Sequence, residues 1–218
     1  MLKKIITLFK IGRKLALSDA LDIVSKIYEI PIVIKIFFNV LGLFGKKNLS
    51  QNDSEGEKLC RSLESMGITF IKLGQFLATR PDIIGEKLSN QLQTLQDKVP
   101  AFPRDVALEE IKDGVGNENY KDFINISEPI AAASIAQVHK AQINENGVIK
   151  EVAIKVLRPK IKKVFNDEIE ALMLLAYIIE SFVKETKRLK LVDVVYLLKE
   201  ITNHEMDLMI SKTTAHLI

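Results

Sequence analysis

The sequence contains little cysteine, no tryptophan and few histidines: Cys60 is the single cysteine of 218 residues, and there are three histidines. One cysteine excludes a disulfide framework and a cysteine-rich zinc site. The charge is nearly balanced, with 31 basic and 28 acidic residues and a net charge of +3. No basic block is interleaved with aromatic side chains, so we expect no nucleic-acid partner. The 47% hydrophobic content is too high for a disordered chain and indicates one sizeable core or two small ones.

The sequence also lacks an apolar run of membrane-spanning length. Residues 30–44 are very apolar, but this run is about 15 residues long where about 20 are needed to cross a bilayer. Pro31 and Lys35 interrupt it, and no small-residue cleavage site of a secretory signal follows. Residues 1–17 are basic and amphipathic. They favour either a helix packed on the rest of the chain or a helix lying on an anionic membrane surface.

The pattern of apolar and turn-forming residues divides the chain into four parts. We predict amphipathic, membrane-proximal helices over 1–45, a polar linker over 46–56, a helical region over 57–120, and a sheet followed by two helices over 121–218. The fold class is therefore expected to be α+β.

Three helices are predicted in the helical region. The first covers 57–77 and is followed by a break at Pro81–Asp82. The second begins at Gly85 and ends before Pro100, and the third opens near Pro103 and ends at the glycines 114 and 116.

Over 122–158 the spacing of apolar residues changes from the helical pattern to the alternation typical of β-strands. Segments 122–131, 134–143 and 151–158 are rich in Ile and Val with partial alternation, and Asn146–Gly147 separates the last two. Two helices are expected afterwards, over 162–184 and 191–209. The first of them is apolar on most sides, which predicts that it is buried.

One lysine of the last predicted strand is a candidate for phosphate binding. In a strand, Ala153 and Lys155 share one face, while Val152, Ile154 and Val156 share the other. An ammonium on a sheet face beside a pocket can hold phosphate oxygens. A lysine on an ordinary exposed sheet face is the alternative interpretation.

The turn before the second predicted strand is the next candidate. A hairpin upstream of a lysine strand can cover nucleotide phosphates, and glycine would let its backbone approach them closely. This sequence instead has Ala131, Ala132, Ala133 and Ser134. Alanine keeps the backbone amide donors but restricts the turn. An ordinary hairpin with small residues packed under a helix is the alternative.

The third candidate lies in the helical region. Lys72 and Gln75 are three residues apart, which places them on one face of a helix. They could equally be polar residues of an ordinary helix surface.

Taken together and in this order, the motifs resemble the UbiB-like atypical protein kinases, the AarF/ADCK family linked to ubiquinone biosynthesis. The resemblance runs from about residue 55 to Met209. It is carried by KLGQ at 72–75, RPDIIGEKLSNQLQTLQDKVP at 80–100, AAASIAQVHKA at 131–141 and VAIKV at 152–156. This family has an alanine-rich loop where other kinases have a glycine-rich one.

The resemblance implies a kinase-like N-lobe over 121–218, with a small antiparallel sheet and an αC-like helix, preceded by a helical extension bearing the Lys-x-Gly-Gln motif. It implies ATP and Mg²⁺ as cofactors, with Lys155 and the alanine loop as the nucleotide-binding residues. Lys72 and Gln75 match the regulatory motif, and Glu205 and Asp207 match its Glu-x-Asp partner. We therefore expect Lys72 to lie within ion-pair reach of Glu205.

The family also implies partners and a location. A membrane surface and ubiquinone-biosynthesis proteins are the expected partners. The expected location is peripheral, on the cytoplasmic side of a bacterial inner membrane, or else cytoplasmic.

The end of the sequence departs from the family pattern. Ser211 stands where the family has the glutamate partner of the strand lysine, and the catalytic C-lobe residues are not found. We therefore expect a truncated N-terminal part that has no complete catalytic set, has no metal site and is catalytically incompetent alone. Two alternatives stay open: a non-catalytic remnant that binds a membrane surface or a partner, and an unrelated helical membrane-surface protein with a chance VAIK strand.

Overall fold

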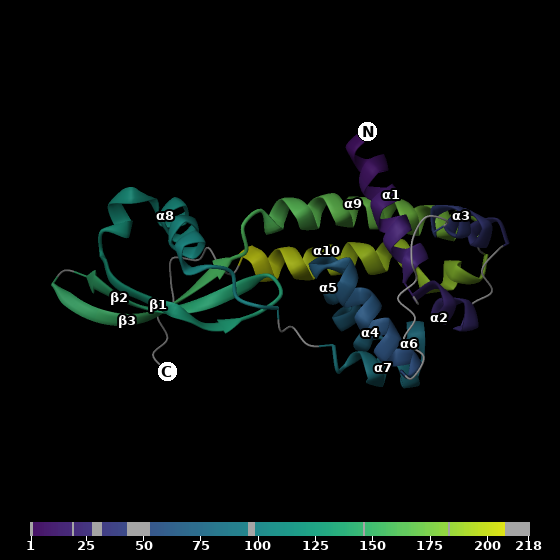
Figure 1. Cartoon of the computed structure of the whole chain (residues 1–218), viewed down its shortest axis with the longest axis horizontal. Helices are drawn as coiled ribbons and strands as arrows, with labels where there is room; N and C mark the ends of the chain where they lie inside the picture. Colours follow the sequence, from purple (N-terminus) through teal and green to yellow (C-terminus); the bar gives the residue numbers. More distant parts are fainter. Residues whose placement is uncertain are drawn as a thin grey trace. The chain divides into compact units, whose positions relative to one another are not determined.

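The computed structural model describes residues 2–18, 20–27, 32–42, 53–95, 99–145, 147–182 and 184–207 (Figure 1). The chain forms two compact units, which we call the helical unit and the sheet unit. The helical unit comprises Met1–Gln96 and Lys163–Ile201, and the sheet unit comprises Asp97–Lys162 and Thr202–Ile218. The predicted division at residues 45, 56 and 120 stays a prediction.

The helical unit begins with short helices that pack on one another. They are α1 (Leu2–Leu17), α2 (Ala20–Ile27), α3 (Ile32–Gly42), α4 (Glu55–Met66), α5 (Ile68–Ala78), α6 (Pro81–Ile84) and α7 (Glu86–Leu92). Helix α1 packs against α3 and α4, while α4, α5 and α7 pack against one another. Within the described ranges, no helix is long and apolar enough to cross a membrane.

The start of α4 is set by a capping box. The Ser54 side chain accepts a hydrogen bond from the Glu57 backbone N–H, and the Glu57 carboxylate accepts one from the Ser54 N–H. This second bond holds the pKa of Glu57 below its usual value, because it favours the charged carboxylate. The helix therefore begins at Glu55, inside the predicted linker, whose residues 46–52 lie outside the described part of the chain.

Two glycines change the predicted helix boundaries. The predicted helix over 57–77 is two helices, because Gly67 has a φ of 111° and ends α4 before α5 begins. The third helix was predicted to end at Gly116, and Gly116 does break the helix with a φ of 81°. The chain then makes one further helical turn, which ends at Tyr120. Both breaks place glycine in the left-handed region that other residues disfavour.

The core of this unit lies between α4, α5 and α7. Met66, Phe70 and Leu92 are at most 1% exposed. Gly74 of the KLGQ motif packs so closely that a Cβ there would come 2.5 Å from Leu95 Cδ2 and 2.6 Å from Leu63 Cδ1. The glycine of this motif thus has a packing role in addition to any role that the family assigns to the motif.

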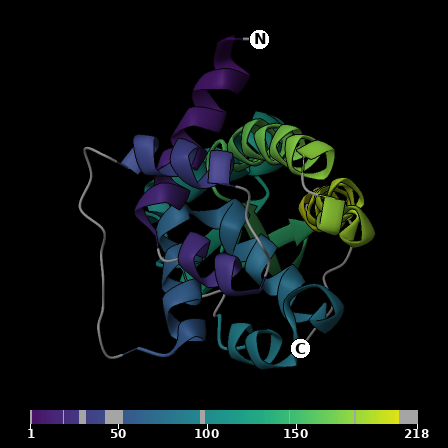
Figure 2. The same cartoon turned by 90° about the vertical axis from the view of Figure 1, so that its right-hand side faces the viewer.

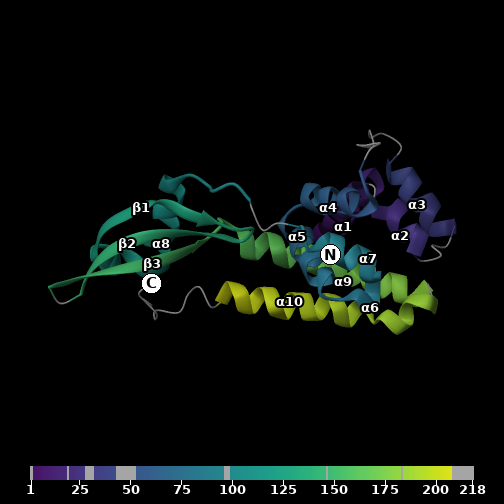
Figure 3. The ribbon, with the colours of Figure 1, turned by 90° about the horizontal axis from the view of Figure 1, so that it is seen from below.

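Two long helices complete the helical unit over most of their length. Helix α9 (Ile161–Phe182) is followed by the 3-10 helix η1 (Lys184–Leu189) and by α10 (Leu191–Asp207). Figures 1, 2 and 3 all show α9 and α10 side by side, and the Glu180 carboxylate accepts a hydrogen bond from the Val192 N–H at 3.0 Å. The prediction that the first of these helices is buried is wrong on one side: Val164, Leu174, Tyr177, Ile178 and Phe182 are 38–76% exposed.

The sheet unit contains a three-stranded antiparallel sheet in the order β1-β2-β3, one helix that precedes it, the first residues of α9 and the end of α10. Its elements are α8 (Arg104–Tyr120), β1 (Phe123–Ala132), β2 (Ala136–Glu145) and β3 (Val148–Leu157). This architecture confirms the predicted α+β class and the sheet over 122–158. It also confirms that Lys155 lies on a strand.

The two sheet pairings differ in regularity. Strands β2 and β3 pair without interruption from Ala136–Leu157 to Glu145–Val148. Strand β1 shifts register against β2 at three places, between Phe123 and Pro129 and again before Ala131. Bulges of this kind bend a strand and increase its twist.

Helix α8 covers one face of the sheet, as Figures 1 and 3 show. Ala107 and Ile111 of the helix are buried together with Ile126, Ala141 and Val156 of the strands. Val152 and Ile154 pack against the same cluster. The predicted two faces of β3 are thus confirmed, and Lys155 points to the face opposite α8. We call this the open face of the sheet.

Candidate functional site

Lys155 and Ala131 lie in one cross-strand row, two strands apart, with Val138 between them. Val138 pairs with Lys155 across β2 and β3, and with Ala131 across β1 and β2. Paired residues of antiparallel strands project to the same face. The open face therefore carries the row Ala131, Val138 and Lys155, in which Lys155 and Ala131 are exposed.

The alanine segment is a strand end and a turn, as predicted. Ala131 and Ala132 finish β1, and the Ala133 N–H donates to the Ala136 carbonyl at 2.7 Å across the turn. Exposure falls along the segment, from Ala131 on the open face to Ser134, which is 0% exposed. Only its beginning is thus accessible on the same face as Lys155.

Arg158 holds the turn from the end of β3. Its guanidinium donates to the Ala133 carbonyl at 3.0 Å and to the Ser134 carbonyl at 2.9 Å. The same group donates to the carbonyls of Val99 and Pro100 at 3.1 and 2.8 Å. Its Cζ atom also lies 5.6 Å from the centroid of the Phe102 ring, a cation–π distance. One side chain therefore fixes both the turn and the segment 99–102.

Two buried polar residues of β2 attach the same segment to the sheet. The Gln137 amide accepts from the Phe102 N–H at 2.8 Å and donates to the Phe102 carbonyl at 3.1 Å. His139 Nδ1 lies 2.7 Å from the Ser127 carbonyl, which can only accept, so Nδ1 carries a proton there. His139 Nε2 then accepts from Gln137 at 2.9 Å. Gln137 and His139 are both 0% exposed, and this network satisfies their polar atoms.

Sequence reasoning did not identify these positioning residues. Arg158 was placed at the end of the last predicted strand and was given no role. Gln137 and His139 were included only as members of the AAASIAQVHKA motif. A signal was nevertheless present: Gln137, His139 and Ala141 share the strand face that also buries apolar residues. Polar side chains at such positions require specific partners.

The residues predicted to form the regulatory motif lie on two helices. Lys72 and Gln75 are half-buried on α5, in the helical unit. Glu205 is half-buried near the end of α10, in the part that belongs to the sheet unit. The expected approach of Lys72 to Glu205 therefore joins two separate units and stays a prediction.

Asp207 has a partner that the sequence did not indicate. Its carboxylate accepts a hydrogen bond from Lys162 Nζ at 3.0 Å, and both side chains are well exposed. Exposed pairs of this kind contribute little to stability. Ser211, which stands where the family has the glutamate partner of the strand lysine, lies outside the described residues, so this predicted departure stays untested.

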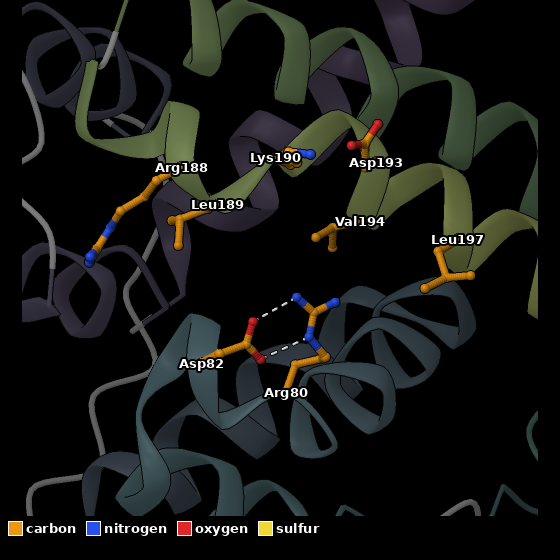
Figure 4. A pocket seen from close by; sticks show the side chains of 8 residues that line it. All are labelled: Arg80, Asp82, Arg188, Leu189, Lys190, Asp193, Val194 and Leu197. Atoms are coloured by element: carbon orange, nitrogen blue, oxygen red, sulfur yellow. Dashed lines mark hydrogen bonds and ion pairs between the residues drawn. The ribbon is translucent and has the colours of Figure 1, made fainter.

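The helical unit contains a cavity of about 280 Å³ between α6, η1 and α10 (Figure 4). Arg80 and Asp82 face each other at its wall, with the guanidinium donating to both carboxylate oxygens at 2.8 and 2.7 Å. This hydrogen bonding lowers the pKa of Asp82 and keeps it charged. Because the two charges engage each other, we assign the cavity no ligand. Its remaining lining residues are Arg188, Leu189, Lys190, Asp193, Val194 and Leu197.

The described residues offer no ready ligand set for a metal ion. Nowhere in the described ranges do three or more His, Cys, Asp or Glu side chains form a group that could hold one. Burial raises the pKa of the Cys60 thiol, the single cysteine, which disfavours the thiolate that metals bind. We therefore assign no residue of this chain to the Mg²⁺ that the family implies.

A comparison with protein families identifies the sheet and its neighbours. Residues 94–213, more than half of the chain, match the ABC1 atypical kinase-like domain. The chain belongs to the ABC1 atypical kinase-like family. The matched residues of this family include the alanine segment, Lys155, Arg158 and Glu205.

Curated relatives support the same assignment. The chain is 38% identical over 168 residues to a probable protein kinase UbiB of Tolumonas auensis, covering 77% of this chain and 30% of the relative. It is 39% identical over 183 residues to that of Glaesserella parasuis, covering 83% and 33%. Its identity to the probable protein kinase UbiB of Marinobacter nauticus is 37% over 191 residues, which cover 86% of this chain and 34% of the relative. The chain thus spans about a third of the length of these relatives. The identities show that it belongs to a UbiB-like family.

Proposed function

We propose that this chain provides the nucleotide-binding lobe of an atypical kinase or ATPase of the UbiB type, which supports ubiquinone biosynthesis. The observation that carries the proposal is the row formed by Ala131, Val138 and Lys155 on the open face of the sheet. The row brings Ala131 of the AAAS motif and Lys155 of the VAIK motif, 24 residues apart in sequence, onto one face of the sheet.

Lys155 would hold the phosphates of ATP. Its ammonium is exposed on the open face, where it has room to meet an anionic ligand. Charge-assisted hydrogen bonds to phosphate oxygens are about twice as strong as neutral ones. The family implies that Mg²⁺ accompanies ATP and neutralises phosphate charge when it is bound.

The alanine segment would form one wall of the nucleotide site. The exposed methyl of Ala131 neighbours Val138 on the open face. Such a surface can pack against an apolar part of the nucleotide, while Lys155 contributes the charge. Arg158 holds the turn from its carbonyl side, which keeps this wall in one conformation.

The test is ATP binding with matched lysine variants. Lys155→Ala removes the proposed phosphate contact, whereas Lys150→Ala removes an exposed lysine of the same strand that pairs with Glu145. We expect the unaltered chain to bind ATP with a dissociation constant of about 1 mM, and Lys155→Ala to weaken binding about tenfold. Lys150→Ala should leave it unchanged, and equal effects of the two variants would contradict the proposal.

A second proposal concerns a membrane surface as partner. On α3, Ile32, Ile36 and Val40 are four residues apart and are 72%, 56% and 57% exposed. They form an apolar stripe on one side of the helix, while α1 exposes Phe9 and Ile6. We propose that this surface lies on an anionic membrane, which for a bacterial protein would be the cytoplasmic side of the inner membrane.

Co-sedimentation with vesicles tests the membrane proposal. Replacing Ile32, Ile36 and Val40 by Gln should lower the bound fraction about tenfold, because each change removes apolar area from the contact. Replacing the exposed Ile124 and Ile130 of the sheet unit by Gln is the matched control and should have no effect. Equal binding of all three proteins to anionic and neutral vesicles would contradict the proposal.

A further inference from the structure

The helical unit also contains a smaller cavity, of about 220 Å³, between α1, α2 and α3. Figures 1 and 3 show these three helices together in one part of the unit. Sites for drug-sized ligands have volumes of about 300 to 1,000 Å³, so this cavity has room for a small polar group. The described residues that line it are Ala16, Leu21, Asp22, Ser25, Lys35, Phe38 and Asn39.

The cavity has an apolar base and a polar mouth. Ala16 of α1 and Phe38 of α3 are 7% and 8% exposed and form the base. Asp22 of α2 is exposed, as are Lys35 and Asn39 of α3, and these three side chains line the mouth. Such a site excludes water from the apolar part of a ligand while polar groups fix its orientation.

The two helices at the mouth supply opposite hydrogen-bonding groups. Helix α3 supplies donors, the Lys35 ammonium and the Asn39 amide N–H groups. Helix α2 supplies acceptors, because the Ser25 hydroxyl donates to the Asp22 backbone carbonyl at 2.8 Å and its oxygen can still accept. The Asp22 carboxylate also accepts and is negative. Within the described ranges Lys35 forms no ion pair, in contrast to Arg80 in the larger cavity.

The mouth borders the apolar stripe of α3. Lys35 follows Ile32 by three residues, and Asn39 follows Ile36 by three, so each polar side chain neighbours a stripe residue on the helix surface. A helix that lies on a membrane buries its apolar face near the boundary between headgroups and acyl chains. The polar side chains beside that face are then at the level of the lipid headgroups.

We propose that this cavity binds the headgroup of a phospholipid whose phosphodiester is linked to a primary ammonium, as in phosphatidylethanolamine. Lys35 and Asn39 would donate to the phosphate oxygens. The ammonium N–H groups would donate to the Asp22 carboxylate and the Ser25 hydroxyl oxygen. A choline headgroup has the same charges but no N–H, so it cannot make the second set of bonds. This inference rests on the proposed membrane contact and names the lipid that the contact would select.

Vesicles of equal charge test the selection. Both kinds contain the same share of phosphatidylglycerol, and the remainder is phosphatidylethanolamine in one and phosphatidylcholine in the other. We expect the chain to co-sediment about fivefold more strongly with the ethanolamine vesicles. Lys35→Gln should remove this preference. Lys10→Gln is the matched control, because Lys10 is an exposed lysine of α1 outside the cavity lining, and it should weaken binding to both vesicles equally.

Asp22→Asn separates headgroup binding from general charge attraction. It removes a carboxylate that an anionic surface repels, so binding to the choline vesicles should become stronger. The preference for ethanolamine should nevertheless be lost, because asparagine offers the ammonium no negative charge. Circular dichroism of each variant checks that the helices are retained.

The outcomes distinguish this inference from the membrane proposal. Equal binding of the unaltered chain to both vesicles, or a preference that survives in Lys35→Gln and Asp22→Asn, would overturn the headgroup site and leave the membrane contact standing. Binding to neither vesicle would overturn both. Soluble phosphoethanolamine offers the same chemistry without a membrane, and calorimetry should detect no binding tighter than about 1 mM. Micromolar binding would show that the cavity takes a free ligand and would also overturn the proposal.

Discussion

The two turns of the sheet are built in different ways. The turn between β2 and β3 uses local chemistry: Gly147 has a φ of 84°, and its N–H donates to the Asn144 side chain at 2.8 Å. The turn between β1 and β2 contains no glycine, and none of Ala131 to Ser134 has a positive φ. Its carbonyls are instead held by Arg158, 24 and 25 residues away.

This difference explains how alanine can replace glycine in the first turn. A turn without positive φ does not need glycine, provided that another group fixes its carbonyls. Arg158 supplies that group, and Gln137 anchors the segment 99–102 beside it. Among the described residues no such distant side chain reaches the second turn, where the Gly147 N–H is held by Asn144.

Arg158→Ala should have the largest effect. It leaves the carbonyls of Val99, Pro100, Ala133 and Ser134 without their charged donor, which we expect to cost about 3 kcal/mol of unfolding free energy in the sheet unit. Hydrogen exchange of the Ala133 amide should accelerate with it, because the turn loses its support. Urea denaturation and exchange measured by NMR give the two quantities.

Arg104→Ala is the control for this loss of an arginine. Arg104 donates to a single carbonyl, that of Ile126, at 2.6 Å, so its removal should cost about 1 kcal/mol. It should leave exchange at Ala133 unchanged. If both variants lose the same stability and Ala133 stays protected in both, Arg158 does not hold the turn.

Gln137→Leu should have the next largest effect and lower the free energy of unfolding by about 2 kcal/mol. Leucine is similar in size but leaves the Phe102 N–H, the Phe102 carbonyl and His139 Nε2 without a partner in a buried place. Gln142→Leu on the open face of the same strand is the control and should be nearly neutral. Thermal unfolding of the three proteins provides the comparison, and a neutral Gln137→Leu would show that the segment 99–102 is held by Arg158 alone.

The same contrast shows what sequence reasoning could reach. Gly147 and its neighbours carry their own turn signal, so that turn was predictable, as were the three strands and the two faces of β3. The family motifs placed Lys155 on its strand and the alanines at a turn. Local patterns suffice for such features because the residues involved are close in sequence.

Other features depend on partners that are distant in sequence. The hydrogen bond from Arg158 to the Val99 carbonyl joins residues that are 59 apart in sequence, and no periodic pattern in the sequence predicts it. The apolar pattern of α9 predicted burial, but a pattern cannot say which side of a helix receives a neighbour, and Phe182 is 76% exposed. The break at Gly67 was missed because an isolated glycine inside a helical pattern is often tolerated.

Gly147→Ala should destabilise the sheet unit by about 1 kcal/mol. No atom lies within 4 Å of a Cβ added there, so the cost comes from the φ of 84° alone. Exchange should accelerate at the paired ends of β2 and β3 and not at Ala133. A stabilising Gly147→Ala would show that the turn relaxes to a negative φ, and that local chemistry does not set it.

Ala133→Gly, the reciprocal change, should have the smallest effect and lower the free energy of unfolding by about 0.7 kcal/mol. No contact in the folded turn is lost, since the carbonyl that Arg158 binds belongs to the backbone. Glycine instead gives the unfolded chain more conformations to lose on folding. The cost should be the same in an Arg158→Ala background, because it arises in the unfolded state. If Ala133→Gly is instead stabilising in that background, the alanine turn is strained once Arg158 is gone, and the arginine compensates for missing glycine. Chemical denaturation of the four proteins of this double-mutant cycle distinguishes the two outcomes.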